Sequence, residues 1–150
     1  MNFRYRSHQI YDIVKGKKSV REGQSVEFKT YKEHSKTLSL DLDLVGGPLL
    51  NMRFKVNAGR ADDPETYRAA LLLDDTRIRG VDYRDLPQKK HYKVTIPAGW
   101  HQNILDPNLS GDDGNRHDPL PDLNPTDLKD FLHKVAALWQ IELPHEAMLI

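Results

Sequence analysis

The chain has 150 residues, with 22 basic and 22 acidic side chains, seven histidines and no cysteine. This length fits a single domain, residues 1–150, whose core needs no disulfide or metal to be stable. The absence of cysteine excludes disulfide frameworks, thiolate zinc sites and cysteine nucleophiles, and the zero net charge argues against a constitutively basic nucleic-acid-binding protein. No apolar run has the length of a transmembrane helix, and the first residues lack the apolar core of a signal peptide. We therefore expect a cytoplasmic protein without membrane contact.

The neutral total conceals an uneven distribution of charge. Residues 1–60 carry 12 Lys or Arg and 6 Asp or Glu, whereas residues 61–150 carry 10 and 16. The two parts could neutralise each other inside the fold, and this is the interpretation we favour because distant segments usually mix in space. Alternatively, the protein has a dipolar surface whose basic side binds an acidic or phosphate-rich partner.

The first elements predicted along the chain are one helix and three strands. Residues 8–15 favour a short helix, because apolar residues recur there at helical spacing. Polar and apolar residues then alternate in three segments, as is typical of strands with one solvent-facing side: 25–31, 37–45 and 52–57. In the last two strands, Asp41 and Asp43 would lie opposite Arg53 and Lys55, a favourable pairing of charges.

The middle of the chain predicts more strands and one long loop. Residues 67–73 are apolar on both faces, which favours a central strand covered on both sides. Further strands are expected at 77–83, 92–96 and 100–105. Residues 106–124 are rich in Pro, Asp, Gly and Asn, so they predict a polar loop that is either functional or mobile.

A C-terminal helix is predicted from both capping and periodicity. Asn124 is suited to cap its N-terminus and Pro125 to occupy the first turn, while Pro144 prevents continuation. Apolar residues recur with the spacing of an amphipathic helix: Leu128, Phe131, Leu132, Val135, Leu138 and Trp139. The sequence therefore predicts an α+β domain, in which an antiparallel β-meander of about five to seven strands carries the C-terminal helix on one face and is preceded by the short N-terminal helix.

The predicted strand at 77–83 does not alternate cleanly. Strict alternation would place Ile78 and Val81 on opposite faces. A bulge at Gly80 would correct the phase, because glycine permits the backbone that an extra residue requires. Ile78, Val81 and Tyr83 would then face the core, and three polar residues would share the other face: Arg77, Arg79 and Asp82. The alternative interpretation is an ordinary ion pair on the surface.

Two histidines flank the next predicted strand. In an extended segment His101 and Asn103 point one way and Trp100 the other, so Trp100 anchored in the core would hold His101 outward. If the segment 91–105 pairs with 77–83, four candidate catalytic residues converge: Arg79, Asp82, His91 and His101. Such a cluster suits acid–base chemistry, with His as proton carrier, Asp as orienter and Arg stabilising a phosphate-like transition state. A polar structural network is the alternative.

The candidate binding residues lie beside that cluster: Arg77, Trp100, Asn103 and His117. Three histidines, His91, His101 and His117, could in principle hold zinc with an open position for water, but no compact ligand spacing supports such a site. Residues 106–112 match the first half of a calcium loop, and the match then fails. We therefore predict neither a metal site nor a cofactor.

The order of these motifs resembles a group of small bacterial proteins. The segments that carry the resemblance are Arg-Ile-Arg-Gly-Val-Asp-Tyr at 77–83, His91, Gly-Trp-His-Gln-Asn-Ile at 99–104, the Pro- and Asp-rich loop, and the Leu-Lys-Asp-Phe-Leu helix. Together, over about residues 67–140, they resemble proteins akin to the TumE-type toxins of toxin–antitoxin systems. Those proteins show an Arg-x-Asp strand, a His and a His-x-His element before a terminal helix. Asn103 stands here in place of the second His of that element.

This resemblance implies a cytoplasmic protein, associated with mobile elements, that acts on nucleic acid and is neutralised by a partner protein. The residues of interest carried over from it are Arg79, Asp82, His91, His101 and Asn103.

Two hypotheses about function remain after the sequence analysis. In the first, a toxin-like intracellular protein acts on RNA or another phosphate-bearing substrate through the Arg/Asp/His face, and an antitoxin-like protein is its partner. In the second, the chain is a non-catalytic interaction module or homodimer, as the uneven charge and the apolar residues 147–150 suggest. The sequence leaves open whether the protein is an enzyme.

Overall fold

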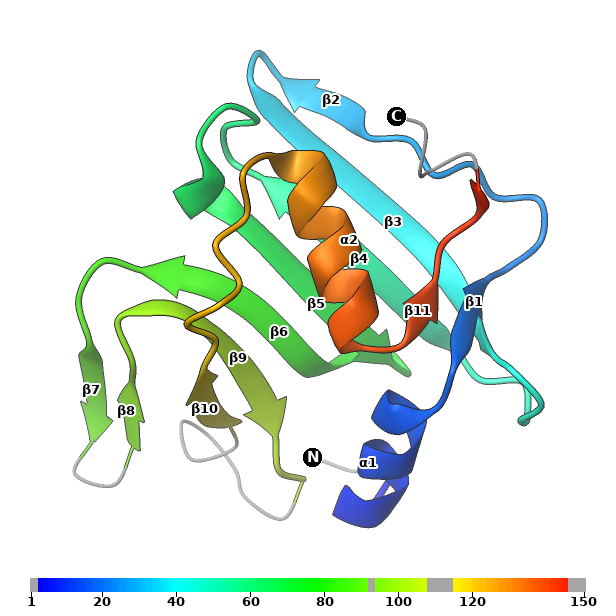
Figure 1. Ribbon diagram of the computed structural model, residues 1–150. Coiled ribbons are helices and arrows are strands. Elements are labelled where there is room, and N and C mark those ends of the chain that lie inside the picture. The colour runs from blue at the N-terminus through cyan, green and yellow to red at the C-terminus, as the bar shows by residue number, and fades with distance from the viewer. Residues whose placement is uncertain (1–2, 92–93, 108–114, 146–150) are drawn as a thin grey trace.

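The computed structural model describes residues 3–91, 94–107 and 115–145. Figure 1 shows a broad sheet with one helix lying across it and a second helix at its lower end. In chain order the elements are α1 (Ser7–Lys15), β1 (Lys18–Val20), β2 (Lys29–Lys32), β3 (Ser35–Leu44), β4 (Met52–Ala58), a 3-10 turn (Pro64–Thr66), β5 (Tyr67–Leu73), β6 (Thr76–Arg84), β7 (Gln88–His91), β8 (Val94–Ile96), β9 (Gly99–Leu105), β10 (Asn115–Pro119), α2 (Leu128–Leu138) and β11 (Ile141–Glu142).

The described strands confirm the predicted α+β class with a mostly antiparallel sheet. Nine of them form one sheet in the order β10-β9-β6-β5-β4-β3-β1-β11, with β2 beside β3, and β7 and β8 form a separate hairpin. Among the strands described, β1 and β11 alone pair in parallel. The sheet is larger than expected because β10 forms within the segment predicted as a loop at 106–124, and because β1 and β11 are too short to show a pattern. The strand predicted at 25–31 is wrong in its bounds, since β2 covers Lys29–Lys32 and residues 25–28 are not in a strand.

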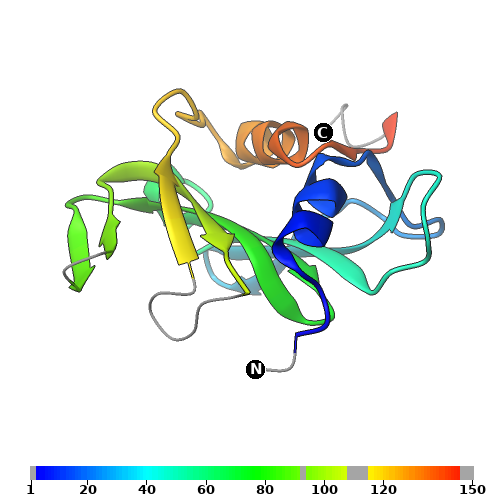
Figure 2. The same ribbon diagram turned by 90° about the horizontal axis from the view of Figure 1, so that it is seen from below.

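Helix α2 covers one face of the sheet, which we call the helix face (Figures 1 and 2). Apolar residues of the central strands are fully buried beneath it, among them Leu40, Phe54 and Leu71. The Trp139 ring meets Phe54 edge to face, and its Nε1–H donates a 2.8 Å hydrogen bond to Gln102 Oε1 on β9. This buried apolar surface is the main stabilising contribution to the fold, and it fixes which side of each strand faces inward.

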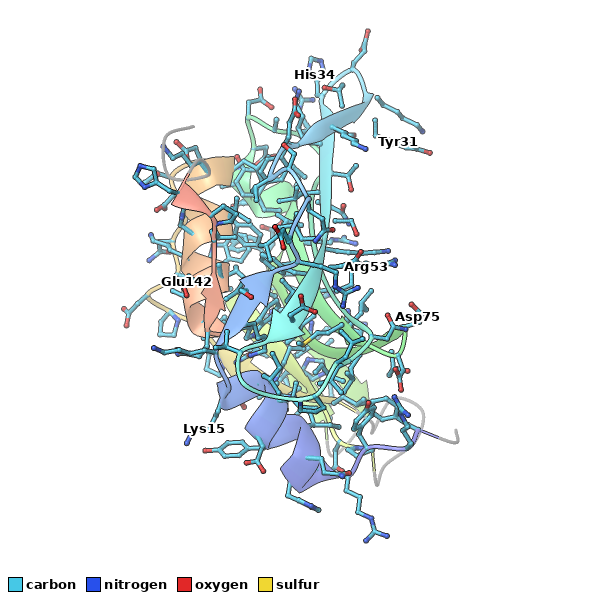
Figure 3. The ribbon with its side chains drawn as sticks, turned by 90° about the vertical axis from the view of Figure 1, so that its right-hand side faces the viewer. Lys15, Tyr31, His34, Arg53, Asp75 and Glu142 are labelled. Atoms are coloured by element: carbon cyan, nitrogen blue, oxygen red, sulfur yellow. The ribbon has the colours of Figure 1, made fainter. Side chains whose placement is uncertain are left out.

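The opposite side of the sheet carries no helix among the described residues, and we call it the open face (Figure 2). Arg53 projects from it, away from α2 (Figure 3). The expectation that 67–73 is covered on both sides is wrong, since Leu71 and Leu73 are buried but Arg68 is exposed. A row of polar residues therefore faces away from the core on the central strands.

The predicted pairing of charges between β3 and β4 is confirmed in part. Asp41 lies opposite Arg53, and the Arg53 Nε to Asp41 Oδ1 distance is 3.3 Å. Asp43 instead accepts from Arg21 at 3.0 Å, and Lys55 lies opposite an uncharged residue, Ser39. Within the described residues, Lys55 thus forms no ion pair on the open face.

The two helices agree with the predictions except at one end. The short N-terminal helix is confirmed as α1. Helix α2 begins at Leu128 rather than beside Asn124, because Asp127 is its cap and accepts from the Asp130 backbone N–H at 2.8 Å. Asn124 has a positive φ of 28° and donates to the Pro121 carbonyl, so it belongs to the preceding turn. Neither helix is long and apolar enough to cross a membrane, within the part of the chain described.

A buried lysine joins the two helices. Lys18 is fully buried, and its Nζ donates 2.7 Å hydrogen bonds to the carbonyls of Val14, Gly16 and Trp139. These carbonyls lie at the C-terminal ends of α1 and α2, where helix dipoles favour a positive charge. Burial, and secondarily the charge of Arg79, lower the pKa of Lys18 to about 8, so the ammonium form is kept at neutral pH.

We expect Lys18→Met to destabilise the fold by roughly 3 kcal/mol or more, because it leaves three carbonyls at two helix ends without their donor. Lys17→Met is the matched control, since Lys17 is exposed and adjacent. Urea unfolding followed by circular dichroism gives the free energy of unfolding for each variant. Equal stabilities for the two variants would contradict this role for Lys18.

Candidate functional site

The position of the site depends on a bulge in β6. Arg77 and Arg79 lie opposite consecutive residues of β5, so Ile78 between them is the extra residue. The bulge predicted at Gly80 is therefore wrong in position, because Gly80 keeps its register with the strands on both sides. An extra residue still restores the alternation of β6 as predicted, but this residue is Ile78, two positions before Gly80.

Because the bulge lies at Ile78 and not at Gly80, Arg79 lies on a different face of the sheet from the one predicted. Two residues of the bulge oppose one position of β5, so Ile78 and Arg79 both lie on the helix face with Val81. The prediction that Arg79 shares a face with Asp82 is therefore wrong. Arg79 is only 8% exposed and donates to the Ile78 carbonyl at 2.8 Å. Burial, followed by the charge of Arg116, lowers its pKa to about 10, so Arg79 stays charged at neutral pH.

An Asp–His pair lies at the centre of the candidate site. Asp82 on β6 is directly opposite His101 on β9, and His101 Nε2 lies 2.5 Å from Asp82 Oδ1. The side chain of His101 is 2% exposed and that of Asp82 is 30% exposed. Asp82 Oδ1 is buried, and the described residues give it no hydrogen bond of good geometry besides this close contact with the His101 ring. The open face thus presents Asp82, with His101 buried behind it.

The surroundings of Asp82 keep its carboxyl ionised. Burial raises the pKa of Asp82, but the contact with His101 and the charges of Arg68 and Arg77 lower it by more. The net result is a pKa below the usual value for aspartate. At neutral pH the open face therefore carries a carboxylate surrounded by cationic groups.

Asn103 and His117 extend this site onto β10. They lie opposite each other in the β9–β10 pair, and His117 Nδ1 donates to Asn103 Oδ1 at 2.5 Å. The His101 and His117 ring centroids are 5.8 Å apart. The structure therefore brings both predicted binding residues beside the Asp82–His101 pair, although His117 was expected in a loop.

Gly80 provides room for the fifth group of the site, the Arg77 side chain. A Cβ at this position would lie 3.3 Å from both Arg77 Cδ and Asn103 Nδ2. The Arg77 side chain thus passes over Gly80 and approaches Asn103. The predicted binding residue Arg77 therefore belongs to the same cluster as Asp82, His101, Asn103 and His117.

Besides Arg79, two more predicted site residues lie elsewhere. Trp100 is on the helix face, as expected of a core anchor, and its ring packs on Phe131. It has no direct place in the site. His91 ends β7, which pairs with β8 rather than with β6, and its side chain lies outside the described residues. The convergence predicted for His91 is thus not supported by the strand pairing.

The contribution of Arg68 was not predicted from the sequence. This residue lies on the open face of β5 and helps to lower the pKa of Asp82. It was overlooked because the segment 67–73 was interpreted as covered on both sides. Arg68 is a polar residue in an otherwise apolar strand, and such a residue indicates which face of the strand is not buried.

The described residues contain no group of three or more His, Asp or Glu side chains placed to hold a metal ion. Most of the segment that partly matches a calcium loop, 106–112, lies outside the described residues. The cluster on the open face instead offers one carboxylate (Asp82), two imidazoles (His101 and His117), an amide (Asn103) and a guanidinium (Arg77). These are groups that move protons and bind anions. Comparisons with models of protein families, with curated proteins and with solved structures found no match.

The lowered pKa of Asp82 predicts how the site affects stability in acid. A carboxyl whose pKa is lowered by folding stabilises the folded state above its unfolded pKa of ~4, and this contribution is lost as pH falls through the folded value. The difference in free energy of unfolding between wild type and Asp82→Asn should thus be constant near neutral pH and shrink in acid. Urea titrations across this range measure it. A difference that instead grows on acidification would show that the pKa is raised.

Proposed function

We propose that the chain acts on RNA, as a toxin-like phosphodiester transferase, through the Asp82–His101 site on the open face. The observation that carries this proposal is the ionised Asp82 carboxylate, which buried His101 holds and the charge of Arg77 stabilises, with the His117 ring beside that of His101. A proton acceptor next to a guanidinium can take up the proton of an attacking hydroxyl and stabilise the charge that develops on a phosphoryl group.

The burial of His101 changes the roles expected from the sequence. His101 is too buried to meet a substrate, so it holds and orients Asp82. Asp82 is the exposed member of the pair and therefore the proton acceptor. His101 is a positioning residue in this account, and the order of the two roles is the reverse of the sequence-based hypothesis.

The proposed reaction is attack by a ribose 2′-hydroxyl on the adjacent phosphodiester. Asp82 accepts the proton of the 2′-hydroxyl as its oxygen forms a bond to phosphorus. Arg77 stabilises the negative charge on the phosphoryl oxygens. The bond from phosphorus to the 5′-oxygen breaks, and this oxygen receives a proton from His117. The products are a 2′,3′-cyclic phosphate and a 5′-hydroxyl, and no metal or cofactor is consumed.

We expect Asp82→Asn to lower the rate of RNA cleavage by about 100-fold or more, because the amide cannot accept the proton. Asp41→Asn is the matched control: it makes the same change on the same face, at a carboxylate paired with Arg53. The measurement is the rate of product formation from end-labelled RNA, with the product termini identified by mass spectrometry. Wild-type protein that leaves RNA and simple phosphodiesters unchanged would sink the proposal, as would equal rates for the two variants.

Expression in bacteria without a partner tests the toxin-like character. Wild-type protein should arrest growth and Asp82→Asn should not, at equal soluble levels. Asp82→Asn is preferable to His101→Ala here, because loss of a buried ring can also unfold the protein. Equal, harmless growth with both proteins would contradict a toxin.

The alternative of a non-catalytic interaction module or homodimer is tested by the same proteins. Residues 147–150, which motivated it, lie outside the described residues. Sedimentation of the full chain and of a chain ending at Pro144 would reveal a dimer that depends on this segment.

A further inference from the structure

Three cationic side chains near the candidate site form no ion pair with a described carboxylate. Lys55, Arg68 and Arg77 lie on the open face of β4, β5 and β6. Their side chains form no ion pair within 4.0 Å with any described carboxylate, unlike Arg53 on the same face. Arg68 and Arg77 act on Asp82 only through their charges. The open face therefore has an excess of positive charge at its centre.

The residues between these cations are small. Lys55, Ala70, Gly80 and Asn103 lie opposite one another in successive strands, so they form one row across the sheet. Neighbouring strands are about 4.8 Å apart, so this row spans roughly 14 Å. Ala70 rises little above the backbone, and the Arg77 side chain lies over Gly80, so the middle of the row is low and is already crossed by a cation.

A fourth cation continues the surface beyond Asp82. Arg84 is the next residue of β6 on the open face, and it lies opposite Gly99, which has no side chain. Its Nε is buried and has no hydrogen-bond partner in the described part of the chain. A buried guanidinium N–H without an acceptor is costly, and an anionic ligand would satisfy it.

The extent of this surface indicates the kind of ligand. Four cations on three strands exceed what one phosphate can contact, so they fit a chain of phosphates. The described open-face residues of β4, β5, β6 and β9 include no Phe, Tyr or Trp on which bases could stack. Binding would therefore be directed to the backbone rather than to the bases.

We propose that the open face binds an extended single strand of RNA through its phosphates, across β4, β5 and β6, with Lys55, Arg68, Arg77 and Arg84 as the contacts. This inference rests on the proposed function and adds the part of the protein that holds the strand on either side of Asp82. It specifies a polynucleotide rather than a mononucleotide as the substrate.

Salt dependence of binding provides the test. A protein that neutralises phosphates of a single strand loses affinity with a log–log slope of about −0.7 per phosphate, so four contacts give a slope of about −3. Full-length Asp82→Asn protein, which prevents turnover, is titrated into fluorescently labelled oligouridylate at several KCl concentrations. In this background Lys55→Gln and Arg68→Gln should each make the slope shallower by about 0.7.

Lys15→Gln is the matched control, since Lys15 is exposed on α1 and points away from the open face (Figure 3). It should leave the slope unchanged. Oligothymidylate of the same length should bind with similar affinity, because the contacts are to phosphates. An equal effect of Lys15→Gln, tighter binding of duplex RNA, or binding of polyglutamate in place of RNA would each overturn the inference.

The two proposals fail in different ways. RNA cleavage by the wild type, with slopes unchanged by Lys55→Gln and Arg68→Gln, would overturn the binding surface and leave the reaction intact. The expected slopes without any cleavage by the wild type would overturn the reaction and leave the binding surface intact.

Discussion

The alternation of side chains along β6 is the constraint on which the site depends. Ile78 and Val81 are three residues apart and both are buried beneath α2, which an unbroken strand does not allow. One extra residue at Ile78 resolves this conflict, because burying both side chains outweighs the loss of one regular pairing in the sheet. The same shift places Asp82 on the open face, directly opposite His101. Without the bulge, the side chains of β6 beyond Ile78 would each point to the opposite face of the sheet. The Asp82–His101 pair would then not form.

The protein treats its buried charges in two ways. Lys18 is enclosed by three carbonyls at two helix ends, and Arg79 donates to a backbone carbonyl on the helix face. The three carbonyls around Lys18 satisfy its charge within the fold, and these hydrogen bonds link α1, α2 and β1. On the open face, by contrast, Arg84 Nε and Asp82 Oδ1 are buried without a well-aligned partner among the described residues. Asp82 Oδ1 keeps its close contact with the His101 ring, whereas the Arg84 N–H has no acceptor there. Buried polar atoms without a partner are rare in stable folds, and one on an uncovered face indicates a candidate binding site.

Much of the fold could be predicted from the sequence because it follows from apolar periodicity. The alternating apolar residues of β3 and β4 and the apolar stripe of α2 are the residues that become buried. These patterns therefore correctly predicted two strands and a helix. The start of α2 was misplaced because Asn124 and Asp127 are both good caps, and only packing decides between them. β10 was missed because its residues have low strand propensity, and its pairing with β9 is what makes it a strand.

The site was predicted less completely, for a related reason. Asp82, His101 and Asn103 were placed together because they follow from alternation within single strands. Arg79 was assigned to the wrong face, since the position of a bulge depends on the partner strand and not on the glycine alone. Arg68 was missed because the apolar run around it concealed which side was exposed. Local pattern thus predicted the faces, whereas register between strands determined which residues meet.

The central claim is that the open face around Asp82 and His101 is where a nucleic acid strand binds. The most direct measurement is the change in backbone amide and imidazole NMR signals when wild-type protein is titrated with a short deoxyoligonucleotide, which lacks the 2′-hydroxyl and so cannot react. The account predicts that the largest changes lie at Asp82, His101, Asn103 and His117, and at Arg68 and Arg77 beside them. Changes confined to α2 and the helix face, or no changes at all, would contradict it.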